Sequence, residues 1–343
     1  MKNSRDRLTS LAAYSFALML TLIFGAILIV VFTGKNPFVV FGVFFAESFF
    51  SNYGFLEILA KGTPILIASS GMAIAFRCGL WNLGAEGQMA IGAIIATAIG
   101  LNLNLPGIVL LPIIFIASFV GGGIWCGISG YIKNKFMVNE ILSTLMMNYI
   151  ALKLMEYLIR GPMSMKNPIY PRTPEILEQA RVLFIKYPLN STMIVALVLV
   201  PLIWFLIHRS HLGFRLLAVG LDREAARLSG MDINKLTLTV MFISGGICAL
   251  GGTAIIVGDF FRMERNVTGG YGFIAILVVM MARENIVALP LVAFLITGLI
   301  VGAASLTLAE VPAAFSDVLI GLMVLCVVFG NYIETKFKQL ADH

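Results

Sequence analysis

Long apolar runs alternate with short polar connections along most of the chain. Most runs hold few charged residues and are long enough, at about 1.5 Å of rise per helical residue, to cross the roughly 30 Å of hydrocarbon in a bilayer. The pattern predicts an all-α protein, a polytopic transmembrane helical bundle of about ten spans in a single transmembrane domain over residues 1–343. The predicted spans are residues 11–33, 58–77, 87–101, 107–130, 141–159, 191–207, 235–257, 271–282, 286–308 and 314–330.

Composition agrees with this pattern. Of the 343 residues, 59% are apolar and 12% are charged, and the mean hydropathy is +0.95. A soluble domain has roughly 45–50% apolar and about 25% charged residues, so water is not the main solvent of this chain. The net charge of +6 comes from Lys and Arg in short connections and not from a basic domain, so it indicates membrane topology and not a nucleic-acid partner.

The distribution of basic residues predicts the orientation of the spans. An even number of spans places both termini on one side of the membrane, and most Lys and Arg residues in the connections fall on that side. Because cytoplasmic loops carry the excess of basic residues, we expect both termini in the cytoplasm. The first run, residues 11–33, is longer than the apolar core of a signal peptide and lacks a small-residue cleavage site, so we interpret it as a retained helix.

Two longer connections have features of their own. Residues 160–190 are rich in proline and contain a short amphipathic stretch, which predicts an ordered extracytoplasmic cap segment. Residues 208–234 form the longest inner loop and predict one short amphipathic helix, with stop signals at Gly220 and Gly230. Such a helix is a candidate docking surface for a soluble partner, and the alternative is an interfacial helix lying on lipid headgroups. Its apolar positions are Leu217, Leu221, Ala225 and Leu228.

Glycines interrupt the apolar pattern twice, once between residues 79 and 87 and again, more weakly, between residues 269 and 272. Unwound backbone at membrane depth is tolerated only where it is buried in protein or lines a water-filled cavity. Paired interruptions in the two halves of a chain therefore indicate a transport path between two related halves. The glycines are Gly79, Gly84 and Gly87 in the first break and Gly269, Gly270 and Gly272 in the second.

Four polar residues, Arg77, Asn82, Glu86 and Gln88, gather at the first break. An ionisable group inside the membrane costs at least about 2.5 kcal/mol by insertion scales, so each needs a partner or a water-lined path. We expect Arg77 and Glu86 to form a structural ion pair. The alternative is that residues 77–88 form a solvated inner loop that only turns the chain.

Motifs for catalysis and cofactor binding are missing from the sequence. No GxxxxGK[ST] is present, so the chain cannot hold nucleotide phosphates in the P-loop manner, and no HExxH, G-x-S-x-G or EF-hand pattern occurs. Residues 270–275 match G-x-G-x-x-A, but they follow no predicted strand and open a membrane span, so we reject a dinucleotide site. His208 and His211 have no carboxylate or Cys at ligand spacing. We therefore expect no catalytic residue, no metal site and no cofactor in this chain.

Four segments together resemble a known family, and the most specific of them is FRCGLWNLGAEGQ, from Phe76 to Gln88. The chain is similar to permease subunits of bacterial ABC importers of the branched-chain amino acid and ribose permease superfamily, in the branch for nucleosides and simple sugars. It departs from that branch at Cys78 and Trp81, where Ala and Phe are commoner, and this weakens an assignment of the exact solute. The four segments are Thr63–Leu66, Phe76–Gln88, Asn139–Ile150 and Ala218–Gly230.

The resemblance implies one subunit of an ATP-driven importer in the bacterial cytoplasmic (inner) membrane, and not an enzyme. Its implied partners are a second permease chain, homologous or identical, cytoplasmic P-loop ATPase subunits that use ATP and Mg²⁺, and an extracytoplasmic substrate-binding protein or lipoprotein. The implied solute is a nucleoside or a related small sugar-like compound. In this family, the inner loop seats in a cleft of the ATPase. The implied coupling residues are Gly220, Leu221, Arg223, Glu224, Ala225, Ala226, Arg227 and Gly230.

For the solute pathway, we expect amides and a carboxylate to bind ribose hydroxyls and aromatic rings to stack on a base. Two other protein classes stay open. An ion-coupled secondary transporter of a small polar solute would need no ATPase, and its uptake would fail when the ion gradient collapses. An intramembrane enzyme would need a base at membrane depth, and no predicted span holds a His. The expected pathway residues are Asn82, Glu86, Gln88, Asn148, Tyr271 and Phe273.

Overall fold

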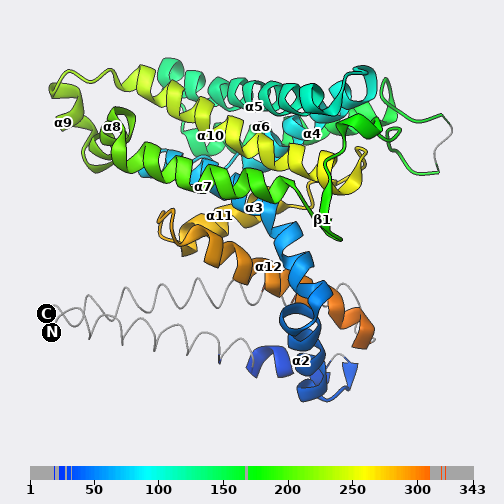
Figure 1. The fold of residues 1–343 in the computed structure, drawn as a ribbon. Helices are drawn as coiled ribbons and strands as arrows, with labels where there is room; N and C mark the ends of the chain where they lie inside the picture. Colours follow the sequence, from blue (N-terminus) through cyan, green and yellow to red (C-terminus); the bar gives the residue numbers. More distant parts are fainter. Residues whose placement is uncertain are drawn as a thin grey trace, which may run out of the picture. The chain divides into compact units, whose positions relative to one another are not determined.

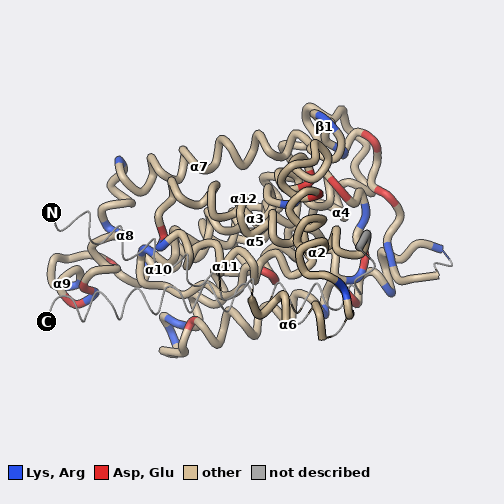
Figure 2. The backbone as a smooth tube through the Cα atoms, turned by 90° about the horizontal axis from the view of Figure 1, so that it is seen from below, with Lys and Arg blue, Asp and Glu red and all other residues tan. Residues whose placement is uncertain are grey.

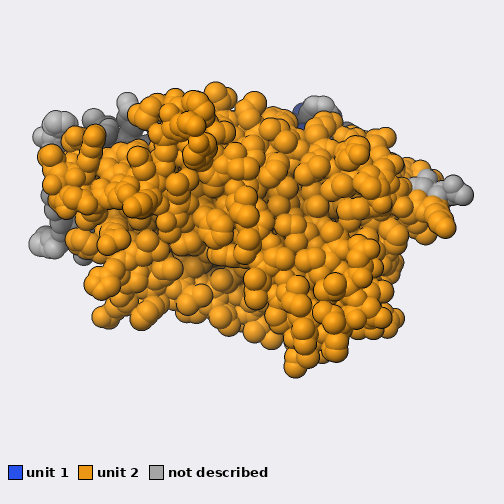
Figure 3. Space-filling model, turned by 90° about the horizontal axis from the view of Figure 1, so that it is seen from above, with its two compact units in different colours: residues 1–58, 295–343 blue, residues 59–294 orange. Residues whose placement is uncertain are grey.

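The structure is a computed structural model that describes residues 19, 23–27, 29–31, 33–166, 169–309, 318 and 321. The chain divides into two compact units, residues 1–58 with 295–343 (unit 1) and residues 59–294 (unit 2), and the surface of unit 2 is drawn in Figure 3. Most of the predicted spans 11–33 and 314–330 lies outside the described residues.

Helices occupy every predicted span between residues 58 and 308, because a long apolar run satisfies its backbone most simply as a helix. Four helices of the described chain are long and apolar enough to cross a membrane, and several shorter apolar helices accompany them, so the total of about ten spans stays a prediction. The helices are α3 (Asn52–Arg77), α4 (Ala85–Asn102), α5 (Gly107–Phe136), α6 (Glu140–Arg160), α7 (Thr192–Arg209), α10 (Ile233–Ile255), α11 (Tyr271–Met281) and α12 (Leu289–Ser305).

The described chain is not entirely helical, and here the all-α prediction missed a detail. The cap segment contains a 3₁₀ turn (Glu178–Ala180) and a small antiparallel hairpin of β1 (Phe184–Lys186) and β2 (Leu189–Asn190). Pro174 precedes this stretch and Pro188 lies between the two strands, and a proline in a helix interior removes a hydrogen bond and clashes, so a helix is disfavoured here.

The core of unit 2 is built around α10, which packs against both α5 and α4. In the apolar stretch of α10 with its π-helical extension (Ile256–Phe260), 89% of the residues are buried, against 28% for α5. Glycines let the backbones touch: a Cβ on Gly252 would lie 1.8 Å from the Met89 carbonyl oxygen, and one on Gly92 would lie 1.9 Å from the Ala249 carbonyl oxygen. This rigid pair positions the unwound segment that precedes α4.

Unit 1 has a small apolar core of its own. It is formed by α2 (Pro37–Phe45), the end of α12 and a 3₁₀ turn (Leu306–Ala309), next to a π-helical turn (Ala46–Phe50). Gly302 packs against the Phe44 ring and Gly298 against the Phe49 ring. The core side chains are Ile29, Val40, Phe44, Ala303 and Leu306.

The two ends of unit 2 differ. Two short helices, α8 (His211–Leu221) and α9 (Arg223–Leu228), lie at one end, and the cap segment with β1 lies at the other (Figure 1). Charged residues gather toward the ends, while long stretches of the helices between them carry none (Figure 2). This distribution suits helices whose middle lengths contact hydrocarbon.

Candidate functional site

The first glycine break is an unwound segment, residues 78–84, between α3 and α4. The side chains of Asn82 and Gln88 exchange two hydrogen bonds across it, Asn82 Nδ2 to Gln88 Oε1 at 3.1 Å and Gln88 Nε2 to Asn82 Oδ1 at 2.8 Å. Asn82 Nδ2 also donates to Ser244 Oγ of α10 at 2.9 Å, and the Gly84 N–H donates to Asn82 Oδ1 at 3.0 Å. Both amide side chains are buried, so the network satisfies polar groups that would otherwise destabilise the interior.

Asn148 of α6 holds the same break from another side. Its Oδ1 accepts from the Gly87 N–H at 2.8 Å, and its Nδ2 donates to the Leu83 carbonyl oxygen at 2.8 Å. The approach depends on Gly87, since a Cβ there would lie 2.7 Å from the Asn148 Cα. Thr144, one turn earlier, accepts from the Leu83 N–H at 3.2 Å. α6 therefore fixes both the unwound backbone and the first turn of α4.

The second glycine break lies directly against the first. Gly269 and Gly270 have φ values of 58° and 75°, and α11 begins at the next residue. One Glu86 carboxyl oxygen accepts from Thr268 Oγ1 at 2.5 Å and from the Gly270 N–H at 3.2 Å. The other accepts from the Gly272 N–H at 2.7 Å, and a Cβ on Gly272 would lie 2.3 Å from the Glu86 nitrogen. Glu86 of α4 thus satisfies backbone N–H groups at the start of α11.

The ion pair predicted between Arg77 and Glu86 is not formed in the described chain. Arg77 Nε instead donates to the Glu284 carbonyl oxygen at 3.2 Å, in the connection after α11. The reason is that the Glu86 oxygens are occupied by donors at the start of α11, whereas Arg77 contacts the turn that follows the end of that helix.

Four of the six expected pathway residues are buried, and their polar side-chain atoms bond within the chain. In this conformation they hold the two breaks together. Of the two aromatic residues, Phe273 is 45% exposed and Tyr271 is half-buried. Contact of any of the six with a solute stays a prediction. The four buried residues are Asn82, Glu86, Gln88 and Asn148.

Sequence reasoning missed two hydroxyl partners of this network. Ser244 lies 162 positions after Asn82, and Thr268 lies 182 positions after Glu86. Separations of this size leave no local pattern for Ser244. Thr268 directly precedes the glycine pair of the second break, and this position is the one local signal that could have indicated it.

The single helix predicted over residues 208–234 is in fact α8 and α9, separated at Asp222. The Asp222 carboxylate accepts from the N–H groups of Glu224 and Ala225 at 2.9 and 3.0 Å. Because this side chain caps a new helix while its own backbone is extended, it ends α8 and begins α9.

Most of the coupling residues lie on an exposed surface of α8 and α9, and Ala226 is the one that is buried. The whole predicted apolar stripe faces outward, since Leu217, Leu221, Ala225 and Leu228 are all exposed. The buried apolar side chains of α8 are instead Leu216 and Val219. A surface that combines exposed leucines with charges suits contact with a protein or with lipid headgroups. The exposed coupling residues are Gly220, Leu221, Arg223, Glu224, Ala225, Arg227 and Gly230.

A groove of about 890 Å³ lies between α9 and the connection of α5 to α6. Its α9 side carries Arg223, Glu224 and Arg227. Its other side carries Lys133 and Glu140, whose side chains form an ion pair at 2.5 Å. Sequence reasoning predicted a docking surface on one loop alone, whereas the groove beside that loop is also lined by the α5–α6 connection.

Asp232, at the start of α10, also lines this groove. Its carboxylate accepts from the Lys235 N–H at 3.1 Å and lies 3.2 Å from the Lys235 ammonium group. The backbone hydrogen bond, followed by the side-chain contact, lowers the pKa of Asp232 below its usual value. Asp232 is therefore ionised at neutral pH and paired with Lys235.

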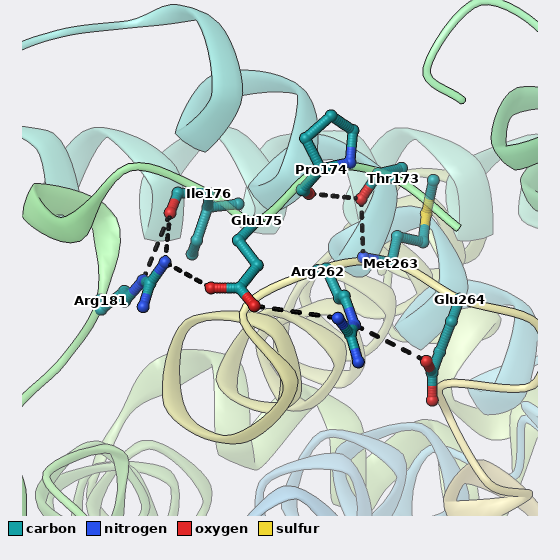
Figure 4. Close-up of polar contacts among 8 residues, drawn as sticks. All are labelled: Thr173, Pro174, Glu175, Ile176, Arg181, Arg262, Met263 and Glu264. Carbon is teal, nitrogen blue, oxygen red and sulfur yellow. Dashed lines mark hydrogen bonds and ion pairs between the residues drawn. The ribbon is translucent and has the colours of Figure 1, made fainter. Parts of the chain in front are cut away.

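The opposite end of unit 2 holds a polar cluster that ties the cap segment to the stretch before the second break (Figure 4). The Thr173 N–H donates to the Met263 carbonyl oxygen at 2.9 Å, and the Met263 N–H donates to Thr173 Oγ1 at 3.0 Å. The Glu175 carboxylate lies 2.8 Å from Arg181 and 3.8 Å from Arg262. The cap segment thus fixes the backbone that leads into the second break.

Within the described residues, no group of three or more His, Cys, Asp or Glu side chains is placed to hold a metal ion. The three described cysteines, Cys78, Cys126 and Cys248, are buried and form no disulfide.

The sequence matches known proteins over nearly its whole length. A family model described as branched-chain amino acid transport system / permease component matches residues 54–328. The chain is 32% identical to the guanosine ABC transporter permease protein NupP of Bacillus subtilis, over 97% of each chain. It is 31% identical to the glucose ABC transporter permease protein TsgB13 of Haloferax volcanii, over 87% of this chain and 82% of that one. It is 24% identical to the nucleoside ABC transporter permease protein NupB of Lactococcus lactis, over 98% and 94% of the two chains.

Proposed function

Since the chain belongs to the family of branched-chain amino acid transport system permease components, we propose that it is the permease subunit of an ATP-driven importer for a nucleoside or a related sugar-like solute. Its relatives are ABC transporter permease subunits, named for guanosine, glucose and nucleosides. Guanosine and glucose both carry a sugar ring with several hydroxyl groups. A compound with such a ring is therefore the solute class we propose.

Energy enters this chain through α8 and α9 in our proposal. These helices are short, exposed and charged, and they project at one end of the long helices (Figure 1). We place this end and both termini in the cytoplasm of a bacterium, with ATPase subunits seated on α9 and in the adjoining groove. The cap segment then faces an extracytoplasmic substrate-binding protein, and a second permease chain completes the complex.

The observation that carries the proposal is the meeting of the two glycine breaks at Glu86. α4 and α11 both begin at this point, and the helix starts are joined by hydrogen bonds from the second break to the Glu86 carboxyl group. Discontinuous helices of this kind are typical of the sites where transporters bind and release solute. Closure of the ATPase subunits would realign α4 and α11 and expose the path to the other side of the membrane.

We propose that the solute meets Phe273 and Tyr271 first. The Phe273 ring is exposed in this conformation, and an exposed ring offers a stacking surface to a nucleobase or to a sugar face. The buried amides at Asn82, Gln88 and Asn148 become available to sugar hydroxyls only when the breaks move apart. Their participation therefore belongs to a second conformation of the transport cycle.

The test is uptake by the complete complex in proteoliposomes. Labelled guanosine, glucose and riboflavin are supplied with the binding protein outside and ATP inside. We expect ATP-dependent uptake of a solute with a sugar ring, unaffected by ionophores that collapse ion gradients. A complex whose ATPase subunits lack the P-loop lysine is the matched control and should show no uptake. Uptake that follows an ion gradient and ignores ATP would instead identify a secondary transporter.

A further inference from the structure

The end of α8 lies directly on the end of α3. A Cβ on Gly220 would lie 2.2 Å from the Arg77 carbonyl oxygen, so the absence of a side chain lets the two backbones meet. A Cβ on Gly79, the first glycine of the first break, would lie 3.8 Å from the Gly220 Cα. The docking surface on α8 and α9 therefore touches the first break with no side chain in between.

The Arg77 side chain extends this contact to α11. Its Nε donates to the Glu284 carbonyl oxygen at 3.2 Å, and the Glu284 N–H donates to the Val279 carbonyl oxygen of α11 at 3.1 Å. Arg283 and Glu284 have φ values of 49° and 59°, a backbone conformation that L residues rarely adopt and that surrounding contacts must hold in place. Arg77 thus joins α8 to the C-terminal end of α11, while Glu86 holds the N-terminal end.

We infer that Arg77 is a positioning residue that carries a displacement of α8 to α11 and so to the second glycine break. The inference rests on the proposed function, in which a partner ATPase moves α8. A close-packed contact such as that of Gly220 with the Arg77 backbone passes on a shift instead of absorbing it. The Arg77 guanidinium holds its donors in one plane, so its hydrogen bond to Glu284 is directional. If the contact between Arg77 and Glu284 is lost, we expect fewer solute molecules to be moved for each ATP hydrolysed.

The test compares Arg77→Met with Arg77→Lys in the complete complex in proteoliposomes. Met keeps an apolar stem but removes every donor, whereas Lys keeps a donor and the charge. We expect Arg77→Met to lower the ratio of solute moved to ATP hydrolysed by about fivefold or more, the lower end of typical coupling effects, and Arg77→Lys to retain most of it. Arg160→Gln, which removes a charge at the far end of α6, is the matched control and should keep the wild-type ratio.

Gly220→Ala tests the contact of α8 with the Arg77 backbone, because the new Cβ must push the Arg77 carbonyl away. Its matched control is Gly127→Ala, a helical glycine with open space where the Cβ would lie. We expect Gly220→Ala to lower the transport ratio and Gly127→Ala to keep it. An unchanged ratio in Arg77→Met, or an equal fall in Arg77→Lys, overturns the inference. If Arg77→Met does not assemble, Gly220→Ala decides, and a wild-type ratio in that variant overturns the inference.

Uptake by the wild-type complex distinguishes a failure of this inference from a failure of the proposed function. Absence of ATP-dependent uptake in the wild type would contradict the proposed function and remove the inference with it. Normal wild-type uptake together with unchanged ratios in Arg77→Met and Gly220→Ala would contradict the inference alone.

Discussion

Polar residues have different roles in two regions of the molecule, the buried junction of the two glycine breaks and the exposed surface of α8 and α9. At the junction, Glu86 is 2% exposed and both its carboxyl oxygens accept hydrogen bonds from within the chain. On α9, Arg227 is exposed and its side chain has no partner among the described residues. The first kind of residue is held by the fold, and the second is the kind that we propose contacts the ATPase subunits. Substitutions at the junction should therefore cost stability, whereas substitutions on α9 should cost transport and leave stability unchanged.

The largest effect on stability is expected from Glu86→Ala. Removal of the carboxyl group leaves the buried Thr268 hydroxyl and Gly272 N–H, and the partly buried Gly270 N–H, without their acceptor. Each unsatisfied buried donor costs about 1–3 kcal/mol, so the free energy of unfolding should fall by about 3 kcal/mol or more. Thermal unfolding of the purified chain in detergent measures this. Glu178→Ala, at an exposed position of the cap segment, is the control, and equal stability of the two variants would contradict the structural role of Glu86.

The next effect is expected from Gly272→Ala, which tests the contact between the two backbones. The new Cβ would lie 2.3 Å from the Glu86 nitrogen, so α4 and α11 must separate. Overpacking of a close contact costs about 1–3 kcal/mol. The same unfolding measurement should show this loss, while Gly127→Ala should show none because its Cβ meets open space. A variant at position 272 as stable as the wild type would mean that the two breaks are not in contact.

A smaller effect is expected from Glu175→Gln in the cap segment. This change removes the charge that faces Arg181 and Arg262, but the Glu175 side chain is 51% exposed, so water and salt already screen the pairs. Exposed ion pairs contribute about 0.2–1 kcal/mol, and the loss should shrink further at high salt. Unfolding at low and high salt measures it. A loss as large as that of Glu86→Ala would show that the cap cluster belongs with the buried junction.

The smallest effect on stability, and the largest on transport, is expected from Arg227→Glu. The exposed side chain leaves no buried group unpaired, so the free energy of unfolding should change by less than about 0.5 kcal/mol. Reversal of a charge at a docking surface repels the partner, so copurified ATPase and ATP-dependent uptake should both fall. Glu224→Arg should behave in the same way. Wild-type uptake in both variants would contradict the docking assignment on α9.

The positions of the helices and of the two breaks could be predicted from the sequence because both signals are local. An apolar run of sufficient length predicts a helix, and clustered glycines predict its interruption. The contact between the breaks could not be predicted in this way, because Glu86 finds Thr268 across 182 positions. The predicted pair of Arg77 and Glu86 relied on closeness in sequence, which carries little information once the backbone between two residues is unwound.

The docking segment shows a second limit of sequence reasoning. The spacing of Leu217 and Leu221 indicated one continuous helix, but the Asp222 side chain competes as an N-cap and starts a new one. The spacing of the leucines favours one helix and the Asp222 side chain favours a new helix start. Periodicity alone does not show which of these two preferences is stronger. The exposure of the coupling residues was expected, whereas the groove beside them depends on the α5–α6 connection, which lies far away in the sequence.

The most direct test of the account is photo-crosslinking from α9 in the complete complex within native membranes. A photoreactive amino acid replaces Arg227, and another replaces Glu178 in the cap segment. We expect position 227 to form an adduct with the P-loop ATPase subunit and position 178 to form none with it. An adduct between position 227 and the extracytoplasmic binding protein, or an ATPase adduct from position 178 alone, would contradict this expectation.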